Sequence, residues 1–233
     1  MTYTEEIKLL LQQSITVPKS KSTLFFKTGV GDYAENDQFI GVTVPKLRSL
    51  SKRFLHIPLT DIQELLQSPI NEERHLALFI LVELYKKNKP EDKEIVYQFY
   101  LNNLKHVNNW NLVDSSAHLI IGAHLQNENK NLLIKLAQSQ NIWERRIAIV
   151  STWYFIRNNN FEWTFNIASA LLDDTHDLIH KAVGWMLREA GKRNTTALQD
   201  FLSLYAPKMP RTMLRYAIEK FSIEQRKNYL LKK

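Results

Sequence analysis

The feature that most constrains the fold of this chain is an amphipathic helical segment that recurs about once every 30 to 40 residues. Apolar residues return at helical spacing in five long segments, residues 71–87, 109–125, 142–157, 177–193 and 210–221. Shorter helical segments lie between them, at residues 91–104, 130–138, 162–172 and 196–206. A helix pair that repeats in this way is typical of an α-solenoid, so the sequence predicts an all-α fold of HEAT-like helical repeats.

The first 70 residues are less regular. Residues 28–41 have the polar, glycine-containing composition of a loop, and Pro45 is placed to begin the next helix. Gly29 and Gly31 lack the third glycine and the preceding strand of a dinucleotide-binding turn, so no such site is expected. We expect a single HEAT-like-repeat domain over residues 1–233, with residues 1–70 as less regular N-terminal helices and residues 71–233 as the repeats.

Composition excludes several classes of site. The chain has no cysteine, which excludes disulfides, thiolate metal sites and cysteine nucleophiles. It begins with glutamates where a signal peptide carries positive charge, and no apolar run reaches transmembrane length, so a cytoplasmic protein that does not bind membranes is expected. Lys and Arg outnumber Asp and Glu by 31 to 24, and the resulting net charge of +7 suits a polyanionic partner.

Superposing the long segments places four basic residues and one acid on the same turn of successive helices. These residues are Arg74, Asp114, Arg146, Lys181 and Arg215. Stacked repeats would align them along one face, which predicts a concave, basic face with one carboxylate in its middle. The alternative is that they are ordinary solvated positions on exposed helix faces.

Two tryptophans accompany this stripe. Trp110 precedes Asp114 by four residues and Trp185 follows Lys181 by four, so each shares a helix face with its charged neighbour. Either indole could instead belong to the core. The other large aromatic residues lie in apolar helical runs, and we expect them to be buried: Trp143, Trp153, Trp163, Phe155 and Phe165.

Asp114 has two interpretations. Its position before Ser115 and Ser116 favours a helix N-cap on local sequence alone. Its setting argues for a function, because a carboxylate that faces nucleic acid repels phosphate unless it stabilises a cation.

Two further constellations are weaker. His176 and His180 are four residues apart and three aspartates lie nearby, but the string HDLIH is not a zinc motif and indicates no third ligand, so solvated side chains are expected. Ser115 or Ser116 as a nucleophile would lack any assignable base beyond His118.

Five segments carry a resemblance to a known family: FIGVTVPKLRSLSK, NNWNLVDSSA, NIWERRIAIV, HDLIHKAVGWMLREAGKR and MPRTMLRYAIEKF. Over nearly its whole length the sequence resembles the DNA alkylation repair family of HEAT-like-repeat DNA glycosylases, the AlkD-like proteins. Members excise N3- and N7-alkylated purines from double-stranded DNA without flipping the base into a pocket. Asn111 and Leu112 stand where relatives can carry a second acid.

The resemblance implies roles for four residues. The family's first tryptophan and catalytic aspartate correspond to Trp110 and Asp114, its arginine to Arg146, and its second tryptophan to Trp185. The DNA contacts expected around them are Arg145, Lys181, Arg188, Arg215 and Arg74. Neither a metal nor another cofactor is implied, and we expect a monomer acting on nucleoid DNA.

The chemistry of such a substrate would explain the lone acid. A purine alkylated at N3 or N7 already carries positive charge, so its glycosidic bond can break without a general acid. One carboxylate then suffices to stabilise the oxocarbenium-like sugar and to position water. The sequence therefore predicts a monofunctional alkylpurine DNA glycosylase, and the alternative is a noncatalytic scaffold that binds DNA structure or a protein.

Overall fold

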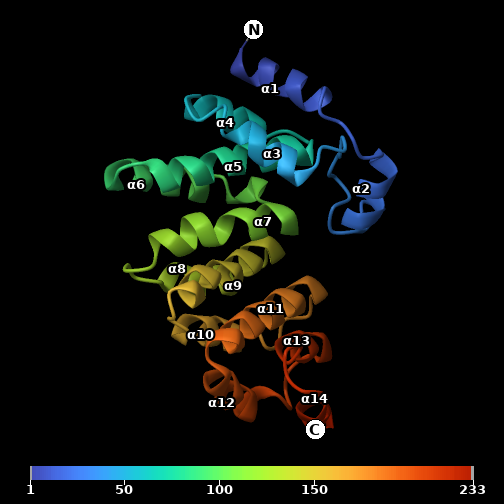
Figure 1. The fold of residues 1–233 in the computed structure, drawn as a ribbon, viewed down its shortest axis with the longest axis vertical. Helices are drawn as coiled ribbons and strands as arrows, with labels where there is room; N and C mark the ends of the chain where they lie inside the picture. The colour runs from blue at the N-terminus through green and yellow to red at the C-terminus, as the bar shows by residue number, and fades with distance from the viewer. Residues whose placement is uncertain (1, 232–233) are drawn as a thin grey trace. The chain divides into compact units, whose positions relative to one another are not determined.

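The computed structural model describes residues 2–231, and its regular structure is helical (Figure 1). Over these residues the extended pairing consists of one isolated bridge between Gln38 and Ile70. The all-α prediction, with helical repeats of the solenoid class, is confirmed. No helix in this range combines the length and the apolar character that a membrane span requires.

The chain divides into two compact units, Met1–Ser116 and Ala117–Lys233. The prediction of a single domain stays a prediction. The helices of the first unit are α1 (Tyr3–Gln12), α2 (Lys19–Phe26), α3 (Val44–Ser51), α4 (Leu59–Leu66), α5 (Asn71–Lys87), α6 (Pro90–Asn102), a 3-10 turn at Leu104–His106, and α7 (Trp110–Ala117), which ends at the boundary.

The second unit opens with a π-helix, η2 (His118–Gly122). Its remaining helices are α8 (Asn131–Ala137), α9 (Ile142–Arg157), α10 (Glu162–Ala170), α11 (Asp177–Arg193), α12 (Thr195–Tyr205), α13 (Arg211–Ala217) and α14 (Ile223–Leu231). Within this unit α9 packs on η2, α8, α10 and α11, and α11 packs on α12 and α13.

Three of the five long helices begin and end where the apolar pattern predicts. Helices α5, α9 and α11 match the expected segments residue for residue. Two segments differ: the expected helix 109–125 changes to π-helical turns after Ala117, and α13 ends at Ala217 rather than at 221. The N-terminal expectations hold, since α3 carries Pro45 in its first turn and residues 28–41 form a loop.

The inner helices supply the core of each unit. Residues 76–82 of α5 and 146–152 of α9 are buried without interruption. A helix that is apolar around most of its circumference must be covered on several sides, which is why these two helices lie inside their units.

The expected aromatic core is partly wrong. Trp143 and Phe155 are buried, at 7% and 0% exposure. Trp153, Trp163 and Phe165 keep partial exposure instead. An apolar run in a helix places some of its side chains toward the rim of the packed layer, and a large ring there is covered on one side only.

Candidate functional site

Asp114 lies within α7 rather than at its start. The helix begins at Trp110, whose backbone N–H donates to Oδ1 of Asn109 at 2.7 Å. Asp114 is the fifth residue of the helix, so the N-cap interpretation is wrong. Its side chain is neither buried nor fully exposed, which leaves the carboxylate at the surface of the first unit.

Trp110 is held by aromatic side chains of the N-terminal region. Phe26 of α2 stacks on the indole with the ring centroids 5.0 Å apart, and Phe25 meets it edge-on at 5.4 Å. The indole Nε1–H donates to the Tyr33 hydroxyl oxygen at 3.1 Å. The indole is therefore fixed in orientation while it remains partly exposed beside Asp114, four residues along the same helix.

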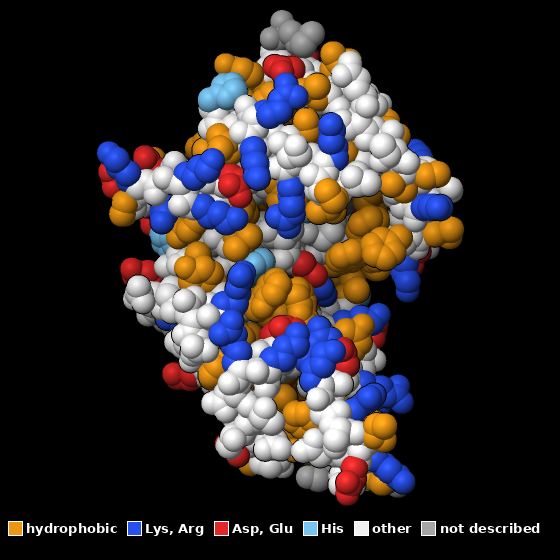
Figure 2. Space-filling model, in the orientation of Figure 1, with side chains coloured by type: hydrophobic (Ala, Val, Ile, Leu, Met, Phe, Trp, Pro, Cys, Tyr) orange, Lys and Arg blue, Asp and Glu red, His pale blue; other side chains and the backbone are white. Residues whose placement is uncertain are grey.

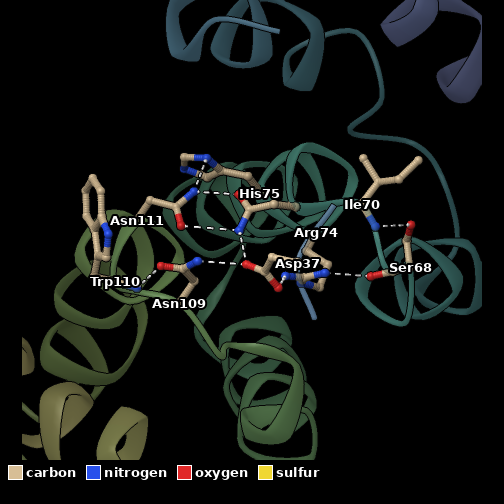
Figure 3. A network of polar contacts seen from close by, with 9 residues as sticks. Asp37, Ser68, Ile70, Arg74, His75, Asn109, Trp110 and Asn111 are labelled. Atoms are coloured by element: carbon tan, nitrogen blue, oxygen red, sulfur yellow. Dashed lines mark hydrogen bonds and ion pairs between the residues drawn. The ribbon is translucent and has the colours of Figure 1, made fainter. Parts of the chain in front are cut away.

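A buried polar network lies beneath this helix and centres on Asp37 (Figure 3). Oδ2 of Asp37 accepts hydrogen bonds from Asn109 at 2.7 Å and from Asn71 at 2.9 Å, while Oδ1 pairs with Arg74. Arg74 also donates to the Ser68 carbonyl oxygen at 2.7 Å. One carboxylate thus ties the 28–43 segment to the starts of α5 and α7.

The network continues through two side chains to the turn that carries Asp114. Nδ2 of Asn111 donates to Asn71 Oδ1 at 2.7 Å and to His75 Nδ1 at 3.2 Å. The Ser115 hydroxyl donates to the Asn111 carbonyl oxygen at 2.7 Å, so Nε2 of His75, 3.0 Å from that hydroxyl, must be the donor to it. These contacts assign His75 the neutral Nε2–H tautomer.

The surroundings of His75 keep it neutral. Its burial lowers the pKa from the ordinary value of 6.5 to about 3, and the charge of Arg48 acts in the same direction. A protonated ring would point an N–H at the Asn111 amide, which is itself a donor. The hydrogen bonds of His75 with Asn111 and Ser115, which join α5 to α7, therefore require the neutral ring.

The serines beside Asp114 have structural roles. Ser116 is fully buried, donates to the Leu112 carbonyl oxygen at 2.6 Å and accepts a hydrogen bond from the Tyr100 hydroxyl at 2.8 Å. The Ser115 hydroxyl donates to the Asn111 carbonyl oxygen of its own helix and accepts a hydrogen bond from His75. Neither hydroxyl is arranged as a nucleophile with a base that could accept its proton.

The superposition of the long segments holds in register. Asp114, Arg146, Lys181 and Arg215 each lie four residues after the first residue of their helix, and Arg74 lies three residues after the start of α5. Their exposure differs, however. Arg215 is exposed and Lys181 is 41% exposed at its side chain, whereas Arg74 and Arg146 are buried.

Arg74 needs correction as a DNA contact. Its side chain is 4% exposed and is committed to Asp37, whose own side chain is 5% exposed. A guanidinium must reach the surface to bind a phosphate, and moving this one would leave the Asp37 carboxylate buried without its cation. Arg74 is therefore a structural residue of the first unit.

Arg145 and Arg146, in the first half of α9, also serve the structure of their unit. Arg146 donates to the Leu178 carbonyl oxygen at 2.6 Å, which ties α9 to the first turn of α11. Arg145 pairs with Asp174 at 2.6 Å and donates to the Ser139 carbonyl oxygen at 2.9 Å. Both residues therefore hold the start of α11, the helix that carries several basic side chains.

The remaining expected DNA contacts lie on α11 and α13. Lys181 pairs with Asp177 at 2.7 Å, and this interaction is the main cause of the lowered pKa of the Asp177 carboxyl. Arg188 lies beside Glu189 and Glu219, and its side chain is 19% exposed. Trp185 is partly exposed and meets Trp153 edge-on, with the ring centroids 4.9 Å apart.

His176 is the N-cap residue of α11, and His180 lies in the first turn of the same helix. Nδ1 of His176 accepts the Leu178 backbone N–H at 3.1 Å, and Nε2 of His180 contacts the Asp174 carbonyl oxygen. Among residues 2–231 no group of three or more His, Asp or Glu side chains is arranged to hold a metal ion.

Sequence reasoning missed two residues near the site. Asp37 lies in a segment expected to be a polar loop, and nothing local indicates that its carboxylate turns inward. Trp153 was expected in the core, yet its ring lies 4.5 Å from that of His118 and has the guanidinium of Arg157 5.8 Å above it. The four-residue spacing of Trp153 and Arg157 is the signal that could have found this pair.

Figure 2 shows Lys and Arg side chains on both units and a hydrophobic cluster on the first. In the first unit hydrophobic side chains gather around α2, where Leu24 and Phe25 are 82% and 66% exposed. In the second unit Lys and Arg side chains gather over α9 and α11 on the face shown. That face offers positive charge beside aromatic rings.

Comparison with known proteins bears on the fold and on the family of the chain. The chain is similar in structure to a predicted DNA alkylation repair enzyme from Enterococcus faecalis, with a TM-score of 0.66 and 17% sequence identity, over 88% of this chain and 95% of that one. At this identity the similarity shows the fold alone. No curated protein matches the sequence. Residues 10–221 match the model of the DNA alkylation repair enzyme family, and the chain therefore belongs to that family.

Proposed function

We propose that this protein is a monofunctional DNA glycosylase that hydrolyses the N-glycosidic bond of N3- and N7-alkylated purines in duplex DNA without flipping the base. Membership of a DNA alkylation repair family supports a role in DNA repair. The observation that carries the specific activity is the setting of Asp114, a carboxylate at the surface of a helix that a buried polar network holds in place.

The network supports this role because it holds in place the helix that carries Asp114. Asp37 accepts the hydrogen bonds of Asn71, Asn109 and Arg74, and His75 fixes the turn that ends at Ser115. A carboxylate that must meet a developing cation gains from such preorganisation, since little reorganisation is needed at the moment of reaction.

The proposed reaction divides into a leaving step and a hydration step. The alkylated purine departs with the electron pair of the glycosidic bond, which neutralises its positive charge and leaves an oxocarbenium-like sugar. Asp114 stabilises that sugar and orients the water that attacks it, and the proton lost by this water passes to solvent. At about 4 Å and an effective dielectric of about 20, such a pair is worth about 4 kcal/mol. That energy corresponds to roughly a thousandfold in rate.

The other residues of the proposed site act around this carboxylate. The indoles of Trp110 and Trp185 exclude water from the sugar and attract its positive charge through their ring faces. Lys181, Arg188 and Arg215 contact backbone phosphates. Arg146, being 5% exposed and bonded to Leu178, acts by holding α11 rather than as an exposed phosphate clamp, and Arg145 acts similarly through Asp174.

Replacement of Asp114 by Asn tests the proposal. Asp114→Asn keeps the size of the side chain and removes its charge, so release of 7-methylguanine from methylated duplex DNA should fall by roughly a thousandfold. Duplex affinity should stay equal or rise, because one repulsion of phosphate is lost. Free base is measured by chromatography and affinity by fluorescence anisotropy.

The matched control is Asp173→Asn, which removes an exposed carboxylate from the second unit. It should excise at the parental rate. Undiminished excision by Asp114→Asn would remove that carboxylate from the mechanism. A parent protein that binds methylated DNA but releases no base would instead favour the noncatalytic scaffold.

A further inference from the structure

A surface pocket of the second unit lies beside Trp185 and has no assigned role. It lies between α9 and α11 and is lined by Trp153, Ile156, Arg157, Glu189, Lys192 and Arg193. Arg157 is the last residue of α9 and Arg193 the last of α11, so both guanidinium groups project from helix ends.

The charges of this pocket favour an anion. Three of its lining side chains are cationic and one, Glu189, is acidic. Glu189 is already matched, because Lys192 pairs with it at 2.7 Å and Arg188 at 3.4 Å. Arg157 and Arg193 are exposed, and Arg193 donates to the amide oxygen of Asn159 at 3.2 Å. Two guanidinium groups with planar forks suit the oxygens of a phosphate.

Trp153 connects this pocket to the proposed site. Its ring forms one wall of the pocket, meets Trp185 edge-on at 4.9 Å, and lies within 4.5 Å of the His118 ring. Trp185 and Lys192 are seven residues apart on α11, and Trp153 and Arg146 are seven apart on α9, so all four lie on the facing stripes of two packed helices.

We propose that this pocket binds one backbone phosphate of the DNA, with the ring of Trp153 against the deoxyribose that adjoins it. Proteins that bind single strands also combine a cationic groove for the backbone with aromatic side chains, although there the rings stack on bases. The bound phosphate would be a neighbour of the nucleotide that meets Trp185, so the pocket would fix the register of the damaged strand. The inference rests on the proposed function for the identity of the strand.

The test uses a duplex that needs no base excision. The full protein is titrated against a duplex with a tetrahydrofuran abasic analogue, in which single phosphates on either side of the analogue are replaced by neutral methylphosphonates. Parent protein should lose affinity at one flanking phosphate. The double variant Arg157→Gln with Arg193→Gln should bind more weakly to the unmodified duplex and show no further loss at that phosphate. Its plot of log affinity against log salt concentration should be shallower by about 0.9, because the contact to one phosphate is lost.

Further measurements distinguish binding in the pocket from a general effect of charge and from a loss of folding. Arg226→Gln removes an exposed arginine from α14 and should keep the parental response to each methylphosphonate. Trp153→Phe keeps an aromatic ring and all the charges, so it should lower affinity with the salt dependence unchanged. Circular dichroism melting curves establish that each variant is folded at the assay temperature.

Two outcomes would overturn the assignment. One is an equal loss at every methylphosphonate in the parent and the double variant. The other is binding of inorganic phosphate that depends on Arg157 and Arg193 while the duplex response is unchanged, which would assign the pocket to a free anion. A failure of excision does not affect these readouts, so the glycosylase proposal and the phosphate pocket can fail separately.

Discussion

The side chain of Asn111 shows how the residues next to Asp114 are constrained. Its amide nitrogen donates to Asn71 and His75, and its oxygen faces Nδ2 of Asn71 at 3.4 Å. An amide supplies donors and an acceptor at one position, whereas a carboxylate supplies acceptors alone. The amide at this position is therefore part of the packing of α5 on α7, and its 9% exposure removes it from direct chemistry.

Replacement of Asn111 by Asp should therefore be costly. The new carboxylate would face Asn71 Oδ1 and His75 Nδ1, both acceptors, and we expect a loss of about 2–4 kcal/mol in the free energy of unfolding. The same charge should raise the pKa of His75. Urea denaturation measures the first effect and NMR titration of the imidazole the second. Asn102→Asp, on the exposed side of α6, is the control, and equal losses in both variants would contradict the role of Asn111.

His75 predicts a dependence of stability on pH. Its pKa in the folded protein is lowered from 6.5 to about 3, so the unfolded chain binds the proton more tightly. The contribution of His75 to stability is therefore fully present above about pH 6.5 and is lost progressively down to about pH 3, by up to about 1.4 kcal/mol per pH unit. The pH dependence of the free energy of unfolding should show that the parent takes up about one proton more on unfolding than His75→Gln does, between about pH 3 and pH 6.5. If the imidazole titrated near its ordinary pKa in the folded protein, the assignment of a neutral His75 would be wrong.

At the scale of elements, close helix contacts depend on glycine. A Cβ added to Gly184 in α11 would lie 2.5 Å from the Met213 carbonyl oxygen of α13 and equally near Cβ of Tyr216. Gly122, the last residue of η2, approaches α9 in the same way, since its Cβ would lie 2.2 Å from the Ser151 carbonyl oxygen. The π-helical turns thus occur where one helix must approach another closely.

Replacement of Gly184 by Ala should separate α11 from α13. The obstructing atoms include backbone, which cannot move aside cheaply, and overpacking of this kind costs about 1–3 kcal/mol. Intrinsic helix propensity would predict the opposite, a gain of up to about 1 kcal/mol. Thermal melting distinguishes the two, with Lys135→Ala on the exposed side of α8 as the control. A raised melting temperature for Gly184→Ala would contradict the close approach.

At the scale of the whole molecule, positive charge is divided between structure and surface. The net charge of +7 counts every Lys and Arg equally, but the buried Arg74 and Arg146 serve internal contacts. Binding to a polyanion releases counterions for those cations that reach phosphate. The exposed side chains, and not the formal charge, should therefore set the salt dependence.

Two variants test this division. Arg215→Gln removes an exposed arginine and should reduce the slope of log affinity against log salt concentration by about 0.9 for duplex DNA. Arg74→Gln removes the same formal charge but should leave the slope unchanged while lowering the melting temperature, because it breaks a buried ion pair. A reduced slope for Arg74→Gln would restore that residue as a phosphate contact.

Local periodicity was enough to determine three of the five long helices. The bounds of these three segments agree with the structure to the residue, and the equivalent turns of successive helices are aligned. The reason is that the spacing of apolar side chains in an amphipathic helix indicates which face is buried. What periodicity could not determine was which polar residues of those turns face water. Arg74, on a turn expected to be exposed, is buried because Asp37 reaches it from 37 residues away, and no local pattern encodes that contact. Tertiary packing alone decided it, since a charge enters the interior only where a distant partner compensates for its lost hydration.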